Sequence, residues 1–305
     1  MKILVTIEQF NPEAKKILER LGEVEYRQGF LSDGEIIIVG LGLRIDKEVI
    51  TAAPKLKLIA TATTGLDHID VGYAQEKGIK VVSLQGEDLK EITGTAELAF
   101  GLILSLVRRI PESFNDIKAG NWDRKKFLGN NLAGKMLGII GLGRLGSIMA
   151  KYGQAFGMSV MAYDSRKEAV GNAQLVDFDT LLAKADIISI HAPLNGQTVN
   201  MFNESVFKKM KDSAYLINTA RGAIVNETDL LAALESKIVA GYAADVLSGE
   251  VEFKKDASGH PLVKYAKIHD NIIITPHIGG YTVESRAMTD VIIAKKVHDL
   301  AKKDF

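Results

Sequence analysis

The sequence has no cysteine, no excess of charge of either sign and no apolar run that could span a membrane. The absence of cysteine excludes disulfides, thiolate catalysis and cysteine-based metal sites, and agrees with a cytoplasmic protein. The 38 basic and 38 acidic residues cancel, so no net field would attract nucleic acid or an anionic membrane. The longest apolar run, residues 98–107, is half of the ~20 residues that a membrane helix needs. We therefore expect a cytoplasmic protein that binds neither nucleic acid nor membranes.

The length of 305 residues corresponds to about two domains. Short β-branched runs alternate with helical patterns, which favours parallel sheets covered by helices on both faces. In the first part of the chain, strands and helices are predicted in alternation over residues 2–7, 12–21, 35–39, 46–53, 56–62, 71–77 and 79–84. We therefore predict an α/β fold for this part.

A long helix is predicted over residues 93–110, and Pro111 is expected to end it. A polar connection over residues 112–131 leads to a second series of elements. Its strands are predicted at or near residues 135–140, 159–163, 187–190, 214–218, 239–245 and 272–275, and a final helix is predicted over 282–303. The pattern indicates a second parallel sheet that follows the first.

The most specific motif is the sequence GLGRLG at residues 141–146, which directly follows a predicted strand and opens a helix. Its first glycine permits a tight turn, the second lets the backbone approach a pyrophosphate, and the third lets the helix pack closely on the strand. Backbone N–H groups at the start of that helix favour an anionic ligand. The residues expected at the cofactor are Gly141, Gly143, Arg144, Leu145 and Gly146.

An acidic residue, Asp164, ends the strand that follows this helix. A carboxylate at this position accepts hydrogen bonds from an adenosine ribose and repels a 2′-phosphate, which favours NAD over NADP. Arg166 and Lys167 lie close behind it, and two cations there would instead accommodate a phosphate. We predict NAD as the cofactor.

Three later predicted strands are followed by charged side chains, Arg221, Glu250 and His277 in chain order. Ligand sites in open parallel sheets form at the carboxyl ends of the strands, so these side chains are expected to converge. Hydride reduction of a carbonyl needs a cation near the developing oxyanion and a proton donor. An arginine and a histidine can supply both.

These motifs resemble the D-isomer-specific 2-hydroxyacid dehydrogenase family, especially its phosphoglycerate and hydroxypyruvate dehydrogenase branch. The segments that carry the resemblance are residues 62–70, 95–97, 120–122, 191–194, 218–222 and 275–280. The resemblance covers essentially the whole chain. It implies two Rossmann-like doubly wound parallel-sheet domains: a flavodoxin-like substrate domain over residues 1–95 and 281–305, and an NAD-binding Rossmann domain over residues 96–280. It also implies a homodimer that forms through the second domain and the helix near Thr93.

The resemblance implies catalytic roles for Arg221, Glu250 and His277. Arg221 would hold the carboxylate and keto oxygen of the substrate with its forked guanidinium. His277 would donate a proton during reduction and accept one during oxidation. Glu250 would hold one ring nitrogen of His277 and favour its protonated form, and Glu252 competes with it for that role.

Further contacts to cofactor and substrate are implied in the same way. Asp245 would bind the nicotinamide end of the cofactor. Backbone amides of the first domain would hold the substrate carboxylate, so that catalysis would depend on closure of the two domains. The implied cofactor residues beyond the glycine motif are Thr95, Asp164, His191, Pro193, Thr198, Thr219, Ala220 and Asp245. The implied substrate residues are Thr64, Gly65, Leu66, Arg221 and His277.

Among the six histidines, only His277 is expected to act as the acid. His191 is predicted to lie in a loop against the cofactor. The others, His68, His260, His269 and His298, are expected on surfaces or at helix caps. No HExxH or cysteine spacing is present, so we expect no metal site.

Three functions remain open. The first is an NAD-dependent D-2-hydroxyacid dehydrogenase acting on hydroxypyruvate, glyoxylate or 3-phosphoglycerate. The second is a phosphite-type dehydrogenase, while formate chemistry is disfavoured because similar formate enzymes carry glutamine where Glu250 stands. The third is an NAD-dependent, non-enzymatic binding module of the corepressor type. Arg44 would meet a second anionic group of the substrate, or else is a surface cation at a helix start.

Overall fold

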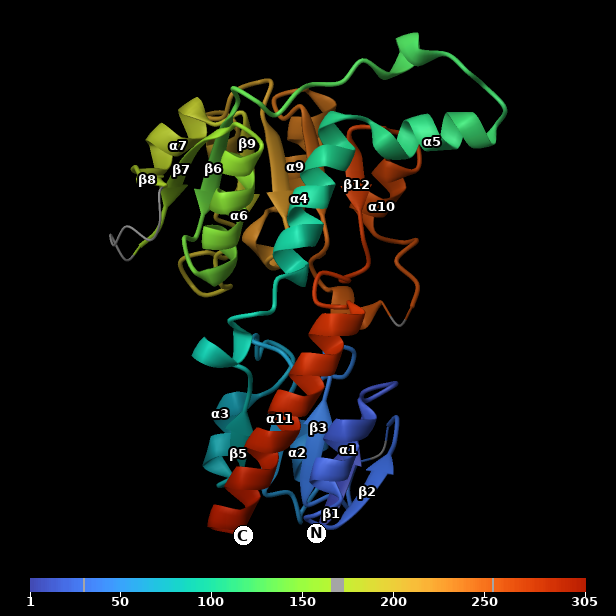
Figure 1. Ribbon diagram of the computed structural model, residues 1–305, viewed down its shortest axis with the longest axis vertical. Coiled ribbons are helices and arrows are strands. Elements are labelled where there is room, and N and C mark those ends of the chain that lie inside the picture. The colour runs from blue at the N-terminus through green and yellow to red at the C-terminus, as the bar shows by residue number, and fades with distance from the viewer. Residues whose placement is uncertain (30, 166–172, 254) are drawn as a thin grey trace. The chain divides into compact units, whose positions relative to one another are not determined.

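The computed structural model describes residues 1–29, 31–165, 173–253 and 255–305, which form two compact units (Figure 1). Unit 1 comprises Met1–Ile92 and Thr282–Phe305, and unit 2 comprises Thr93–Tyr281. Each unit contains one sheet in which all strand pairs are parallel. The predicted α/β fold with two doubly wound parallel sheets is confirmed.

The sheet of unit 1 has five strands in the order β2-β1-β3-β4-β5, which is the flavodoxin-like order. Its strands are β1 (Lys2–Val5), β2 (Glu23–Tyr26), β3 (Ile36–Val39), β4 (Leu58–Thr61) and β5 (Lys80–Val82). Its helices are α1 (Pro12–Leu18), α2 (Lys47–Thr51), α3 (Val71–Glu76), the short 3-10 helix η1 (Gly86–Leu89) and α11 (Val283–Asp304). Helices α1 and α11 lie side by side in Figure 1 and pack against each other.

Strand β2 was not predicted from the sequence. Its residues alternate two glutamates with Val24 and Tyr26, and no side chain of the strand is fully buried. As an edge strand, β2 is paired with β1 alone, so the hydrophobic signal that marks the central strands is missing.

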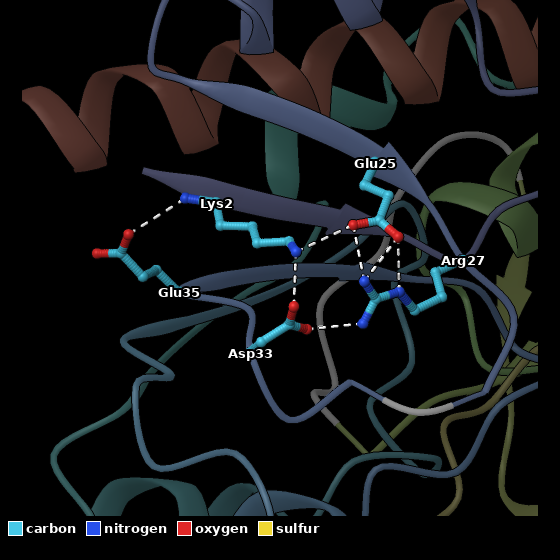
Figure 2. A network of polar contacts seen from close by, with 5 residues as sticks. All are labelled: Lys2, Glu25, Arg27, Asp33 and Glu35. Atoms are coloured by element: carbon cyan, nitrogen blue, oxygen red, sulfur yellow. Dashed lines mark hydrogen bonds and ion pairs between the residues drawn. The ribbon is translucent and has the colours of Figure 1, made fainter.

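A network of charged side chains joins this edge to the rest of unit 1 (Figure 2). Lys2 Nζ lies 2.5 Å from Asp33 and 3.1 Å from Glu25, and the Arg27 guanidinium contacts the same two carboxylates at 2.7 and 2.6 Å. Glu35 accepts a hydrogen bond of 3.1 Å from the Lys2 backbone N–H. The hydrogen bond from Lys2, with that from Arg27, lowers the pKa of Asp33 to about 2.

The sheet of unit 2 has seven strands in the order β12-β11-β10-β9-β6-β7-β8. After β6 the chain adds β7 and β8 on one side and then returns to add β9 to β12 on the other, so the topological switch lies between β6 and β9. The strands are β6 (Met136–Ile140), β7 (Ser159–Tyr163), β8 (Gln174–Leu175), β9 (Ile187–Ile190), β10 (Tyr215–Asn218), β11 (Gly241–Ala244) and β12 (Ile272–Ile274). The helices are α4 (Gly94–Val107), α5 (Ile110–Lys118), α6 (Arg144–Ala155), α7 (Phe178–Lys184), α8 (Glu204–Phe207), α9 (Glu227–Glu235) and α10 (Pro261–Ala266), with 3-10 helices η2 (Arg124–Phe127), η3 (Gly222–Ile224) and η4 (Glu250–Glu252).

The prediction that Pro111 ends a helix was wrong, because Pro111 lies in the first turn of α5. Helix α4 ends earlier, at Val107, and Arg109 adopts a left-handed conformation with φ of 54°. Proline is favoured in the first turn of a helix, where its missing N–H would have no partner. The helix predicted over residues 93–110 is therefore α4, and the second helix, α5, occupies the start of the connection that was predicted over residues 112–131.

Each sheet is covered on both faces by an apolar cluster. In unit 2, residues of α4 and α6 form one cluster and residues of α7 to α10 the other. In unit 1, α1 and α11 cover one face, and α2 and α3 cover the other. Each buried leucine or isoleucine contributes about 1.5–3 kcal/mol. Within the described ranges, no helix is both long and apolar enough to cross a bilayer.

Candidate active site

The glycine motif forms the turn from β6 into α6. Gly141 has φ of +92°, and a Cβ on it would lie 2.8 Å from backbone atoms of His191 and Ala192. A Cβ on Gly146 would lie 2.1 Å from the carbonyl oxygen of Gly141. Gly143 is the N-cap residue of α6 and carries no capping side chain. Any side chain at Gly141 or Gly146 would therefore push the backbone out of this turn.

The start of α6 has free hydrogen-bond donors. The N–H groups of Gly143, Leu145 and Gly146 donate to no acceptor in the described part of the chain. Arg144 begins the helix half-buried, and desolvation lowers the pKa of its guanidinium. Unpartnered amides at a helix N-terminus suit an anion such as a phosphate.

Asp164 directly follows β7, beside the glycine turn. Its carboxylate accepts a hydrogen bond of 2.7 Å from the Leu142 N–H. The acid predicted to bind the ribose is thus held against the glycine turn. Arg166 and Lys167, which could accommodate a 2′-phosphate, lie outside the described residues.

Three buried polar atoms near these strand ends have no partner in the residues that the structure describes. They are His191 Nδ1, Thr219 Oγ1 and Ser147 Oγ. His191 follows β9, and its Nε2 lies 2.8 Å from the hydroxyl of Ser189. Burial lowers the pKa of His191 to about 4, so its ring is neutral at pH 7. Unpaired buried polar atoms are costly, and a bound polar ligand would satisfy them.

The loop after β9 is closed by the side chain of Thr198. Its hydroxyl donates to the carbonyl of Pro193 at 2.7 Å and accepts from the N–H of Asn195 at 2.8 Å. Thr198 and Pro193 therefore shape the loop that follows His191.

The loop after β10 carries Thr219, Ala220 and Arg221. Asn218, the last residue of β10, is fully buried and accepts from the Ala220 N–H at 3.0 Å while donating to the Arg221 carbonyl at 2.9 Å. The Arg221 guanidinium donates to the Ala220 carbonyl at 2.7 Å. Asn218 was not singled out in the sequence, although a polar residue at a strand end directly before an arginine could have marked it.

The loops after β10 and β11 touch through Gly222. A Cβ on Gly222 would lie 2.1 Å from the carbonyl carbon of Leu247 and 2.2 Å from the nitrogen of Ser248. The Ser248 N–H donates to Glu227 at 2.9 Å, and the other Glu227 oxygen lies 3.0 Å from His260 Nε2. The loop that precedes Glu250 is therefore held against the loop of Arg221.

Glu250 and His277 form a close pair. Glu250 Oε1 lies 2.5 Å from His277 Nδ1, and Oε2 accepts from the Leu247 N–H at 3.0 Å. Both side chains are about one quarter exposed. Of the two candidate carboxylates, Glu250 is thus the one at hydrogen-bond distance from His277, and the Nε2 atom of the imidazole remains for another partner.

Asp245 fixes the turn on which His277 stands. Its buried carboxylate accepts from Thr275 Oγ1 at 2.6 Å, from the Ile278 N–H at 2.8 Å and from the Gly279 N–H at 2.7 Å. Its backbone carbonyl accepts from the His277 N–H at 2.9 Å. Desolvation raises the pKa of Asp245, although these hydrogen bonds oppose the shift.

This turn also brings two predicted residues together. His277 has φ of 55°, a conformation that costs energy for a residue other than glycine. A Cβ on Gly279 would lie 3.1 Å from Thr95 Cγ2, so Thr95 at the start of α4 lies directly beside the turn. The strained His277 backbone is held in place by Asp245.

In unit 1, Thr64, Gly65 and Leu66 follow β4. Their N–H groups donate to no acceptor in the described part of the chain. His68, expected at the surface or a helix cap, is instead 3% exposed, with its Nε2 3.3 Å from Thr61 Oγ1, so that prediction was wrong. Among the described residues, no group of three or more histidine, aspartate or glutamate side chains could hold a metal ion.

The family model that matches this protein lies within unit 2. Residues 100–279 match the family model of the D-isomer specific 2-hydroxyacid dehydrogenase NAD binding domain. The D-3-phosphoglycerate dehydrogenase of Archaeoglobus fulgidus is 39% identical over 99% of this chain, which spans 58% of that protein. The glyoxylate reductase of Thermofilum pendens is 38% identical over 88% of this chain and 78% of its own length.

The solved structures include a D-lactate dehydrogenase from Aquifex aeolicus in complex with NAD and lactic acid. It matches with a TM-score of 0.87 and 32% identity, covering 100% of this chain and 96% of that one. The match of the family model over more than half of the sequence, together with these relatives, identifies the chain. It belongs to the D-isomer specific 2-hydroxyacid dehydrogenase family.

Proposed function

We propose that this protein is an NAD-dependent oxidoreductase that interconverts D-2-hydroxy acids and 2-keto acids. The observation that carries the proposal is the contact of 2.5 Å between Glu250 and His277 Nδ1. This pair lies at the carboxyl edge of the same sheet whose β6 end carries the dinucleotide turn. Family membership and the chemistry of the pair point to the same reaction class.

Unit 2 is proposed as the NAD-binding domain and unit 1 as the substrate domain. The tight turn that Gly141 and Gly146 permit, and the amides of Gly143 and Leu145 that have no acceptor among the described residues, fit a pyrophosphate. Asp164 fits an adenosine ribose. Thr219 Oγ1 and His191 Nδ1, buried and without a partner among the described residues, supply further polar groups. Arg144, Pro193, Thr198, Ala220 and Thr95 are the remaining proposed cofactor residues.

The chemistry that a bound nicotinamide cofactor supplies is hydride transfer. Arg221, half-buried at the end of β10, would bind the carboxylate and keto oxygen of the substrate and stabilise the negative charge that develops on that oxygen. His277 Nε2 would donate the proton to this oxygen, and would remove it in the reverse reaction. Glu250 keeps Nδ1 of the same ring occupied, so that Nε2 is the ring nitrogen that remains for the substrate. Asp245 holds the turn that orients His277 and Gly279.

In unit 1, we assign carboxylate binding to the N–H groups of Thr64, Gly65 and Leu66, which have no acceptor among the described residues. Three N–H donors in succession can hold an anion without a cationic side chain. Hydroxypyruvate, glyoxylate and 3-phosphoglycerate remain the candidate substrate types. The named relatives include both a phosphoglycerate dehydrogenase and a glyoxylate reductase.

The reaction is tested by NADH oxidation with hydroxypyruvate, glyoxylate, pyruvate, 2-ketoglutarate and phosphohydroxypyruvate, repeated with NADPH. We expect turnover with NADH, and a loss of about 10²–10⁴-fold in kcat for His277→Ala, because general acid catalysis contributes that much. NADH affinity, measured by fluorescence, should stay unchanged in this variant.

The matched control is His269→Ala, which removes an exposed histidine of the same unit. Full turnover in His277→Ala would contradict the assigned acid. If NADH binds but none of the acids is reduced, phosphite chemistry or a non-enzymatic role would replace the proposed reaction.

We further propose a cytoplasmic homodimer that forms through α5 and the arm that follows it, residues 119–131. Ile110, Phe114 and Ile117 occupy one face of α5, and no residue of this helix is buried. On the arm, Trp122 and Leu128 are 91% and 90% exposed. In Figure 1, the arm extends from the end of α5 and returns to β6. An exposed apolar surface of this kind is typical of a subunit interface, and a second copy is the proposed partner.

A further inference from the structure

Three side chains, His68, Thr61 and Thr63, form a hydrogen-bonded relay that ends on the segment 64–66 of unit 1, whose N–H groups have no acceptor in the described part of the chain. His68 Nε2 lies 3.3 Å from Thr61 Oγ1, and Thr61 Oγ1 lies 2.9 Å from Thr63 Oγ1. Thr63 Oγ1 donates to the carbonyl of Gly65 at 2.9 Å. Thr61 and His68 are 0% and 3% exposed, so these hydrogen bonds are shielded from water except at Thr63.

The donor of each hydrogen bond in this relay follows from the bond at its end. The carbonyl of Gly65 can only accept, so the single hydroxyl proton of Thr63 is used there. Thr61 must then donate to Thr63, and this bond uses the only hydroxyl proton of Thr61. In the hydrogen bond between His68 and Thr61, His68 is therefore the donor, and its Nε2 must carry a hydrogen.

The end of the relay fixes the orientation of one peptide group. The Gly65–Leu66 peptide bond is trans, so the Leu66 N–H points opposite to the Gly65 carbonyl. Because Thr63 holds that carbonyl, the Leu66 N–H is directed away from Thr63 and from the buried relay. This N–H donates to no acceptor among the described residues.

We propose that His68, Thr61 and Thr63 are positioning residues that aim the Leu66 N–H at the carboxylate of the substrate. This inference rests on the proposed function, in which the amides of this segment bind a 2-keto or 2-hydroxy acid. His68 thus acts two hydroxyl groups away from the ligand, and it acts as a fixed donor rather than as a proton carrier.

The backbone around the segment is already held by other bonds. The Leu84 N–H donates to the Thr63 carbonyl at 3.1 Å, the Ile45 N–H to the His68 carbonyl at 2.7 Å, and the Ile69 N–H to the Leu66 carbonyl at 2.9 Å. None of these bonds fixes the Gly65 carbonyl. The Gly65 carbonyl is fixed by the side-chain relay, through Thr63. The relay therefore has a role distinct from that of maintaining the fold.

The kinetic test compares variants that break the relay with variants that keep its donors. Thr63→Val and His68→Leu should raise KM for the preferred 2-keto acid by about tenfold, since loss of an oriented hydrogen bond has this order of effect. The kcat and the NADH affinity should change by less than about twofold, since neither depends on this amide. Thr61→Ser and His68→Gln retain the hydroxyl and an Nε2-type donor, and should stay close to the wild-type KM.

Thr51→Val is the control, because it deletes a threonine hydroxyl of the same unit whose partners among the described residues are Lys47 and Tyr73. An unchanged KM in both Thr63→Val and His68→Leu would overturn the proposal. The proposal would also be overturned if Thr61→Ser and His68→Gln raised KM as much as Thr63→Val and His68→Leu do. The effect would then reflect packing and not the hydrogen bonds.

A second readout needs no turnover. ¹⁵N spectra of the His68 imidazole in the free protein should show a protonated Nε2, and the Leu66 amide should exchange faster in Thr63→Val. If the wild type reduces none of the acids, the proposed function fails, yet this pattern would still support the relay. An Nε2 atom without a proton would overturn the relay whether or not the enzyme is active.

Discussion

At the scale of single residues, the candidate site depends on positions where no side chain is possible. Gly222 lets the loop of Arg221 touch the backbone of Leu247 and Ser248, and the latter loop leads to Glu250. Gly141 and Gly146 likewise permit close backbone contacts at the turn from β6 into α6. Protein interiors cannot absorb contacts near 2 Å without moving backbone, so these glycines set the spacing between loops.

Gly222→Ala should therefore destabilise the protein by about 1–3 kcal/mol, the usual effect of overpacking. It should also lower kcat more than NADH affinity, because the contact lies between the loops of Arg221 and Glu250. Urea unfolding and steady-state kinetics measure the two effects.

Gly101→Ala is the control, because a Cβ there meets nothing within 4 Å. This helical substitution should be neutral or stabilising by up to about 1 kcal/mol. Equal behaviour of the two variants would contradict the proposed role of Gly222.

At the scale of elements, the sequence predicted the buried strands better than the edges and breaks. Strands such as β3 and β9 are continuous apolar runs because both of their faces are covered. Strand β2 is partly exposed and contains two glutamates, so it carries no such pattern. The boundary between α4 and α5 depends on the left-handed Arg109, whose conformation local sequence does not reveal.

The charged network of Figure 2, which joins β1, β2 and the segment before β3, gives a pH-dependent prediction. The pKa of Asp33 is lowered in the folded state to about 2 from a usual value of 3.8. Its contribution to stability is therefore complete above about pH 4 and is lost as the pH falls toward 2.

Asp33→Asn should lower Tm by about 1–3 °C at pH 6, because exposed ion pairs contribute little. The difference from wild type should shrink as the pH is lowered below about 4. Calorimetry at several pH values measures it, with the exposed Asp212→Asn as control. A difference that grows in acid would contradict the assigned pairing.

At the scale of the whole molecule, unit 2 carries an apolar surface that its own core does not use. The three apolar side chains on α5 and the exposed Trp122 and Leu128 on the arm lie outside both clusters of the unit. Helix α4, in contrast, contributes many of its apolar side chains to the core. The proposed homodimer would therefore depend on α5 and the arm more than on α4.

The wild-type protein should sediment as a particle of about twice 33.2 kDa at micromolar concentration. The double variant with Phe114→Ser and Trp122→Ser should sediment as a monomer, because large aromatic side chains dominate such interfaces. Val283→Ser, an exposed apolar position of unit 1, is the control. A monomeric wild type, or a double variant that remains dimeric, would refute this interface.

The sequence by itself determined the α/β class, the positions of the main strands along the chain and the glycine turn between β6 and α6. These features depend on local periodicity and on glycine spacing, which are properties of short segments. The tertiary structure decided which carboxylate meets His277, since Glu250 and Glu252 differ only in how their loop folds. It also decided that His68 is buried beside Thr61 and that Asn218 and Asp245 hold the loops of Arg221 and His277. Burial and pairing of polar side chains depend on segments far apart in the chain, so no local pattern encodes them.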